Sequence, residues 1–207
     1  MTPPKPPTLD DLQNLTAEEL AACRLSLPAD KDFWVFGYGS LMWHPGFAHV
    51  EVRLARLRGF HRSFCIYSHR YRGTPQAPGL VLGLDRGGSC HGMVYRVPAA
   101  EGEGVLDYLY EREMVTGVYR PSWRRAETEQ GPVSAITFVV DRDHRQYAGR
   151  LDRDDMVELI LQGCGNRGPC MEYLENTVHH LRNLGLKDRG LERLLKEVAR
   201  RRKENGR

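Results

Sequence analysis

The sequence predicts an α+β fold in which helices pack against a β-barrel or sheet. Short β-branched or aromatic runs bounded by Gly, Pro and Asp fill the first two thirds of the chain, whereas helical patterns dominate the last third. Strands and helices do not alternate regularly, as they would in a doubly wound fold. A length of 207 residues fits one domain with a sizeable core, which we prefer to two small domains.

The amino terminus is typical of an extended arm followed by a short helix. Pro3 to Pro7 form the arm, and Thr16 with Glu19 three residues later has the pattern of a capping box. Strands are then predicted at 33–37, 51–58, 62–67, 80–85, 91–97 and 134–140. The segment 69–79 between two of them is expected to be a long loop.

Helical periodicity predicts further helices at about 100–113, 152–162, 171–184 and 189–203. The last of these carries an apolar stripe at the spacing of a helix that packs on a core, formed by Leu191, Leu194, Leu195 and Val198.

Composition indicates an ordinary globular protein, with 41% hydrophobic and 28% charged residues. No apolar run approaches the roughly 18 residues needed to cross a bilayer, and the proline-rich start lacks the pattern of a signal peptide. We therefore expect a cytoplasmic protein without a membrane partner. Five cysteines at scattered positions argue against a disulfide framework, and Cys164 and Cys170 lack the spacing of a zinc site, so no metal is expected.

The net charge of +3 is concentrated in the carboxyl-terminal tail. Residues 196–207 contain six Lys or Arg and two Glu, so these twelve residues carry +4 and the rest of the chain −1. A basic helix end of this kind is usually solvated, and cations suit the carboxyl end of a helix dipole. A basic patch interleaved with aromatic residues is absent from the sequence, which argues against nucleic acid as a partner.

The segment from Trp34 to Trp43 is the most informative part of the chain. An apolar strand runs directly into Gly37-Tyr38-Gly39-Ser40-Leu41-Met42. Glycines at such a junction permit a close approach of the backbone, and successive turn N–H groups can bind an anion or a carbonyl oxygen. The alternative is a strand that simply ends in a tight turn.

A dinucleotide site is not supported by this segment. The Rossmann fingerprint needs a third glycine three residues after the second, and Met42 occupies that position. Pro45 and Gly46 then break any helix, and the chain contains no GxxxxGK[ST] motif for a nucleotide phosphate.

The helix near 100–113 places a carboxylate on its apolar stripe. Glu113 follows Leu106, Leu109 and Tyr110 by seven, four and three residues, whereas Glu111 falls on the outer face. Burial raises the pKa of a carboxyl group toward the range in which it can act as a general base. The alternative is a structural ion pair with Arg112, Arg120 or another arginine, and the pattern does not choose between the two.

Other catalytic candidates are weaker. None of the eight histidines stands in an HExxH motif, and Ser40 lacks the GxSxG elbow of a hydrolase nucleophile. Tyr119 and Tyr147 can each supply a hydroxyl to a polar pocket, although packing alone is the simpler explanation for both.

Five segments together resemble the ChaC-type gamma-glutamylcyclotransferases, over about residues 33–195 and in the order of that family. They are VFGYGSLMWHPGF (35–47), RGTPQAPGLVLGLDRGGSCHGMVYRV (72–97), YLYEREMVTGVYRP (108–121), DRDHRQYAG (141–149) and EYLENTV (172–178). The resemblance implies a small mixed β-barrel with packed helices, without metal or cofactor, that degrades glutathione to 5-oxoproline and Cys-Gly. We expect a catalytic domain of this family at 31–198. The amino-terminal arm and helix at 1–30 and the basic tail at 199–207 depart from the family pattern, and no role is assigned to the arm or the tail.

The resemblance also assigns roles to residues. Gly37 to Met42 would bind the gamma-glutamyl group, and Glu113 would be the catalytic acid and base. The substrate's own α-amine attacks its γ-amide carbonyl, so the enzyme needs no nucleophile of its own. Tyr38 and Tyr147 would orient the substrate, and Arg70 or Arg72 in the long loop would pair with a carboxylate.

Three alternatives remain open from the sequence. The same cyclisation could act on another gamma-glutamyl amine or dipeptide, because base and loop would look alike. A binding module that uses the basic tail would bind in a salt-dependent way and would not need Glu113. A catalytically inactive regulator of the same fold would likewise not need a carboxylate on the buried stripe. Oligomeric state is not predicted by the sequence.

Overall fold

The computed structural model describes residues 14–206, so the predicted Pro3–Pro7 arm lies outside the described residues. The described chain forms two compact units. The barrel unit comprises residues 14–63 and 84–144, and the helical unit comprises residues 64–83 and 145–206. Two long strands, β2 (Glu51–Ser68) and β3 (Gly79–Val97), contribute to both.

The remaining elements divide between the units. The barrel unit contains α1 (Ala17–Ala22), β1 (Phe33–Gly37), η2 (Ser40–Met42), η3 (Ala99–Glu101), α2 (Gly102–Glu113), β4 (Tyr119–Thr128) and β5 (Gly131–Val140). The helical unit contains α3 (Arg153–Gln162), β6 (Cys164–Gly165), β7 (Gly168–Pro169), α4 (Cys170–Asn183) and α5 (Arg189–Asn205).

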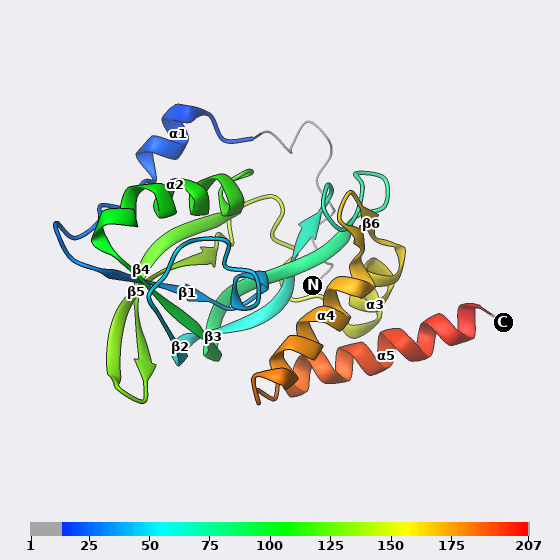
Figure 1. Cartoon of the computed structure of the whole chain (residues 1–207). Coiled ribbons are helices and arrows are strands. Elements are labelled where there is room, and N and C mark those ends of the chain that lie inside the picture. The colour runs from blue at the N-terminus through cyan, green and yellow to red at the C-terminus, as the bar shows by residue number, and fades with distance from the viewer. Residues whose placement is uncertain (1–13, 207) are drawn as a thin grey trace. The chain divides into compact units, whose positions relative to one another are not determined.

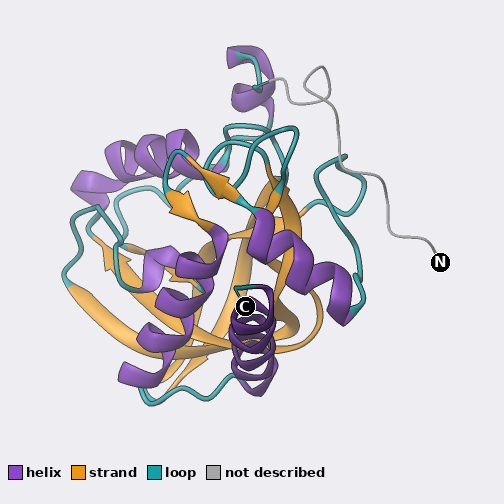
Figure 2. Cartoon of the chain, turned by 90° about the vertical axis from the view of Figure 1, so that its right-hand side faces the viewer, coloured by secondary structure: helices purple, strands orange, loops and turns teal. Residues whose placement is uncertain are grey.

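Five strands close into a barrel in the order β1-β3-β2-β4-β5, and Figure 2 shows their strong curvature. β1 pairs with β5 in parallel and with β3 antiparallel, and β4 pairs antiparallel with both β2 and β5. The barrel is therefore mixed, which confirms the predicted α+β barrel with helices.

Helix α2 packs on the barrel strands through its apolar stripe (Figure 1). Leu106 and Leu109 are fully buried, and the Tyr110 ring meets Phe138 of β5 edge to face. Figure 1 shows α4 and α5 side by side in the helical unit, where Leu191, Leu194 and Val198 are buried as the stripe predicted. No helix within residues 14–206 is long and apolar enough to span a membrane.

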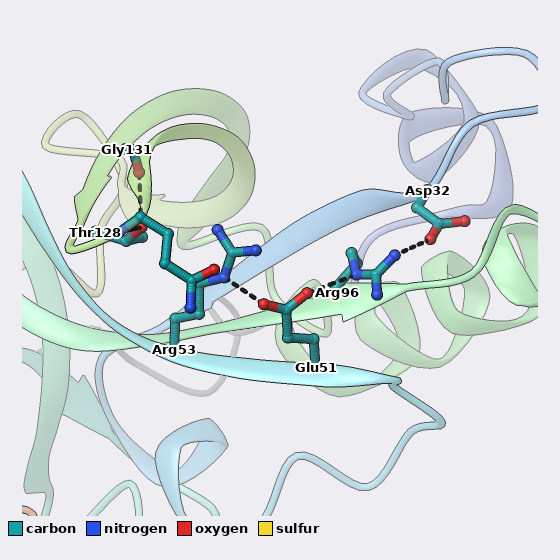
Figure 3. A network of polar contacts seen from close by, with 7 residues as sticks. Asp32, Glu51, Arg53, Arg96, Thr128 and Gly131 are labelled. Carbon is teal, nitrogen blue, oxygen red and sulfur yellow. Dashed lines mark hydrogen bonds and ion pairs between the residues drawn. The ribbon is translucent and has the colours of Figure 1, made fainter.

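A chain of ion pairs joins β2, β3 and Asp32, the residue directly before β1 (Figure 3). Arg96 of β3 bonds to Asp32 at 2.8 Å and to Glu51 at 2.9 Å, and Glu51 also pairs with Arg53. The Arg53 guanidinium lies over the Trp34 ring at 4.4 Å from its centroid. These contacts fix the start of β1. Its other end, at Gly37, leads into the loop that contains η2.

Two features of the strands differ from the prediction. The predicted strands 51–58 and 62–67 form one continuous strand, β2, and 80–85 and 91–97 form another, β3. The glycines between them lie within these strands with positive φ, at 81° for Gly59, 105° for Gly87 and 70° for Gly88. Strand β4 was not predicted. Most of its side chains are at least partly exposed and only Ala126 is buried, so its sequence, YRPSWRRAET, lacks the apolar run that predicts a strand.

The other elements follow the prediction closely. β1 has the predicted bounds, and the helices near 100–113, 152–162, 171–184 and 189–203 are present as η3 with α2, α3, α4 and α5. Thr16 and Glu19 form the predicted capping box at α1, with hydrogen bonds in both directions.

Candidate functional site

The candidate site is built on the loop that follows β1. At Gly37 a Cβ would lie 2.9 Å from Leu41 Cβ, so glycine lets the chain fold back into the short helix η2. The turn is closed by hydrogen bonds from Met42 N to the Gly39 carbonyl and from His44 N to the Ser40 carbonyl, both at 2.9 Å. Gly37 is therefore required by the close return of the chain.

Three consecutive N–H groups of this loop have no hydrogen-bond acceptor within residues 14–206, namely those of Gly39, Ser40 and Leu41. Gly39 and Leu41 are buried, where an unpaired backbone donor is costly. Such a run of donors can bind a carboxylate or a developing oxyanion.

Side chains from two barrel strands form hydrogen bonds with backbone carbonyls of the loop. Arg62 of β2 donates to the carbonyls of Tyr38 and His91, and Tyr95 of β3 donates its hydroxyl hydrogen to the Met42 carbonyl at 2.8 Å. These bonds engage backbone atoms, so they fix the path of the loop.

Arg112 of α2 holds the same loop from the helix side. Its guanidinium makes five contacts. Nη2 donates to Ser40 Oγ at 2.9 Å, and Nε contacts Glu113 Oε1 at 3.2 Å. Nη1 donates to the His44 carbonyl at 2.7 Å, the Pro45 carbonyl at 3.2 Å and the Tyr108 hydroxyl at 2.8 Å. A single side chain thus joins the loop to the carboxyl end of α2.

Glu113 is the last residue of α2 and lies on the buried stripe as predicted. Its side chain is 17% exposed, whereas Glu111 is exposed. Burial raises the pKa of the Glu113 carboxyl above its usual range, and the charge and hydrogen bond of Arg112 offset part of that rise. Glu113 and Ser40 both contact the guanidinium of Arg112, so the predicted base and the predicted binding loop lie close together.

The ion pair expected as an alternative role for Glu113 is present, and Arg112 is the partner. Arg120 pairs instead with Asp141 at 2.7 Å. Because burial has the larger effect on the carboxyl pKa, the pair is compatible with a proton-transfer role for Glu113.

The other predicted site residues, Arg70, Arg72 and Tyr147, belong to the helical unit. Arg72 donates to the Pro169 carbonyl at 3.0 Å and lies over the Tyr173 ring, so its guanidinium has structural contacts. Arg70 is exposed, and Tyr147 is half-buried in an isolated bridge with Ile66. Their roles toward a substrate stay predictions.

Sequence reasoning missed the roles of Arg62 and Tyr95, and it missed the contacts of Arg112 with the loop. The spacing of Tyr108 and Arg112 places them on one face of α2, but this spacing does not indicate a contact with the loop. Across residues 14–206, no group of three or more His, Cys, Asp or Glu side chains is arranged to hold a metal ion.

Known proteins are similar to this chain in sequence and in fold. The sequence profile of a family described as ChaC-like protein matches residues 33–201. The chain is 37% identical over 190 residues to the glutathione-specific gamma-glutamylcyclotransferase of Escherichia coli, covering 91% of this chain and 82% of that protein. It is 31% identical over 181 residues to the Schizosaccharomyces pombe protein of the same name, covering 77% of this chain and 87% of that protein. A crystal structure of a glutathione-specific gamma-glutamyl cyclotransferase from yeast has a similar fold, with a TM-score of 0.76 at 22% identity, covering 82% of this chain and 96% of that one.

Proposed function

The chain belongs to the ChaC-like protein family, and we propose that it is a gamma-glutamylcyclotransferase that cleaves glutathione to 5-oxoproline and Cys-Gly. The observation that carries the proposal is that the largely buried Glu113 carboxylate and a loop with three unpaired N–H donors belong to one site. Both are held by Arg112. The names of the bacterial and yeast relatives support glutathione as the substrate.

The reaction needs no nucleophile from the protein. The α-amine nitrogen of the substrate forms a bond to the γ-carbonyl carbon, and the amide bond from that carbon to the cysteinyl nitrogen breaks. Holding the gamma-glutamyl chain in a folded conformation makes this attack intramolecular. The protein therefore has to supply a conformation, a base and oxyanion donors.

Glu113 supplies the base in this proposal. Its carboxylate removes one proton from the α-ammonium group before the attack and passes it to the departing cysteinyl nitrogen. The ring nitrogen loses its second proton as the lactam forms, and the released amine takes up this proton and leaves as an ammonium group. General acid-base catalysis of this kind contributes about 10²–10⁴-fold. The raised pKa of Glu113 brings its proton affinity closer to that of the groups it serves.

The loop supplies the donors. The N–H groups of Gly39, Ser40 and Leu41 bind the substrate carboxylate or the oxyanion that develops on the γ-carbonyl. Ser40 Oγ accepts a hydrogen bond from Arg112, which leaves its hydroxyl hydrogen for the gamma-glutamyl group. Tyr38 is 7% exposed and fits an orienting role at the edge of this loop.

We further propose that the protein acts in the cytoplasm without a nucleic-acid or membrane partner. An odd number of cysteines at scattered positions is typical of a reducing compartment. The basic end of α5 engages acidic neighbours: Arg200 pairs with Glu197 and Glu204, and Arg201 pairs with Asp154. These carboxylates offset part of the positive charge that a nucleic acid would require at the tail.

The test is glutathione turnover by the wild type, Glu113→Gln and Glu111→Gln, following 5-oxoproline and Cys-Gly together. We expect equal amounts of both products from the wild type and from Glu111→Gln, and a rate lower by about 10²–10⁴-fold for Glu113→Gln. Glu111 is the matched control, because it is an exposed glutamate of the same helix end. Equal rates for all three would remove Glu113 from its role.

Substrate choice is tested with the same proteins. Turnover of a gamma-glutamyl amine or dipeptide that exceeds turnover of glutathione would replace glutathione as the substrate and keep the mechanism. Salt-dependent nucleic-acid binding without turnover of any gamma-glutamyl compound would instead favour the binding-module alternative.

A further inference from the structure

Arg112 uses each of its three guanidinium nitrogens on a different part of the candidate site. Nε contacts Glu113, Nη2 contacts Ser40, and Nη1 contacts the backbone of the loop at His44 and Pro45. Its side chain is only 19% exposed, so these contacts form in surroundings that water screens weakly. This distribution is more specific than a helix-end charge interaction requires.

The Nη1 contacts hold Arg112 in place. The Tyr108 hydroxyl accepts from Nη1 one helical turn before Arg112. Gly46 lets the loop approach this hydroxyl, because a Cβ at Gly46 would lie 2.0 Å from the Tyr108 oxygen. With Nη1 fixed by three acceptors, the directions of Nε and Nη2 are set by the planar geometry of the guanidinium.

The other two nitrogens then fix Glu113 and Ser40 relative to each other. Because both contact one rigid planar group, the carboxylate that takes the proton and the hydroxyl of the binding loop cannot shift independently. Lysine cannot reproduce this, since an ammonium on a flexible stem lacks the fork geometry.

We propose that Arg112 is a positioning residue that aligns the Glu113 carboxylate with the Ser40 loop, so that base and binding loop act as one site. This inference rests on the proposed function for its catalytic consequence. Its structural part, the direct pairing of Arg112 with Glu113, can be measured without any substrate.

The catalytic test compares Arg112→Met and Arg112→Lys with Arg24→Met. Arg24 is the matched control because it pairs with Glu103 and Asp107 of the same helix, away from the loop. We expect kcat/KM for glutathione to fall on the order of 10²-fold in Arg112→Met, as is typical of misplaced reacting groups. Lysine should restore only part of the rate, and Arg24→Met should keep the wild-type rate.

The pH profile separates positioning from a general structural role. Without the arginine charge, the acid limb of kcat/KM should move to higher pH in Arg112→Met, whereas it should stay in place in Arg24→Met. A loss of rate with an unchanged acid limb, or full rescue by lysine, would overturn the proposal. If Arg112→Met does not fold, the rate of Arg112→Lys decides: a wild-type rate overturns the proposal, and a reduced rate supports it.

A titration independent of activity distinguishes this proposal from the proposed function. The carboxyl carbon of Glu113, labelled with ¹³C and assigned by its loss in Glu113→Gln, should titrate at higher pH in Arg112→Met than in the wild type. An unchanged titration would overturn the pairing. Absence of glutathione turnover in a wild type that shows the expected titration would overturn the proposed function instead.

Discussion

Glu113 and Glu111 lie two residues apart at the end of α2, yet Glu113 is largely buried on the stripe that packs against the barrel and Glu111 is exposed. A helix of 3.6 residues per turn separates such positions by more than half a turn. The chemical difference between two identical side chains is therefore set by position on the helix. It follows that paired substitutions at these residues separate the effect of burial from the effect of charge.

The activity should depend on pH through Glu113. Burial raises the pKa of this carboxyl, and its ionised form is the proposed base. We expect kcat/KM for glutathione to rise with pH through a limb that lies above the ordinary glutamate pKa of about 4.3. A pH profile of the wild type checks this, and a limb at or below that value would contradict a raised pKa.

Glu113→Gln should be at least as stable as the wild type near neutral pH. The folded protein holds the Glu113 proton more tightly than the unfolded chain, so the free energy of unfolding falls as pH rises through the interval between the ordinary and the raised pKa. Glutamine keeps an acceptor for Arg112 and does not ionise, so this fall should be absent. Thermal unfolding of both proteins across that pH range measures it, with Glu111→Gln as the control. A lower Tm for Glu113→Gln than for the wild type at neutral pH would show that the ion pair outweighs the cost of burial.

Gly92→Ala should disturb the strand contact beneath the binding loop. A Cβ at Gly92 of β3 would lie 2.3 Å from the Gly37 carbonyl oxygen and 2.7 Å from the Phe36 ring. Overpacking typically costs about 1–3 kcal/mol, and a backbone clash leaves little room for relaxation. We expect lower stability and lower turnover, measured by denaturant unfolding and product release.

Gly104→Ala is the matched control for that substitution. Gly104 lies in α2 and is exposed, and a Cβ added there would have no heavy atom within 4 Å beyond its own neighbours in the helix. The change should stabilise the helix by about 1 kcal/mol and leave turnover unchanged. Equal behaviour of the two alanine variants would contradict the role of the Gly92 contact.

Local patterns predicted those features of the fold that depend on near neighbours in the chain. The periodicity of α2 placed Glu113 on the apolar stripe, and the Thr16 capping box was visible because its partner is three residues away. Strand continuity was not visible. Gly87 and Gly88 have the composition of a turn, and only pairing with neighbouring strands makes them part of β3.

The role of Arg112 in holding the loop was not predictable for a related reason. Its contacts with Ser40, His44 and Pro45 join residues 67 to 72 positions apart, and no local periodicity records such distances. The sequence offered Arg112 only as one of several possible ion-pair partners of Glu113, its neighbour in the chain. The tertiary structure decides which of the charged residues at this helix end holds the loop.

Tyr110→Phe should loosen the segment that follows α1. The Tyr110 hydroxyl accepts from Leu25 N at 2.9 Å and donates to the Cys23 carbonyl at 2.8 Å. Phenylalanine would leave both backbone groups unpaired in a partly buried place, at a cost of about 1–3 kcal/mol. Denaturant unfolding measures the loss. Arg24→Met, which removes ion pairs with the exposed side chains of Glu103 and Asp107, should cost less, about 1 kcal/mol or below, and the reverse order would contradict this ranking.

The cysteines should differ sharply in their reaction with alkylating reagents. Cys164 is exposed, whereas the Cys170 thiol is buried, donates to the Leu80 carbonyl at 2.9 Å and accepts from Leu80 N at 3.4 Å. Burial raises the pKa of Cys170 to about 11, so little of the reactive thiolate is present at pH 8. Cys23 is half-buried, and burial raises its pKa as well.

We therefore expect iodoacetamide at about pH 8 to modify Cys164 first, Cys23 more slowly, and Cys170 only after unfolding. Peptide mass spectrometry at timed intervals follows each site, and a Cys164→Ser variant shows whether the slower sites react independently. Because Cys170 begins α4 and Leu80 lies in β3, its protection also reports on the packing of the helical unit. Modification of Cys170 in the folded protein as fast as Cys164 would show that this packing opens readily in solution.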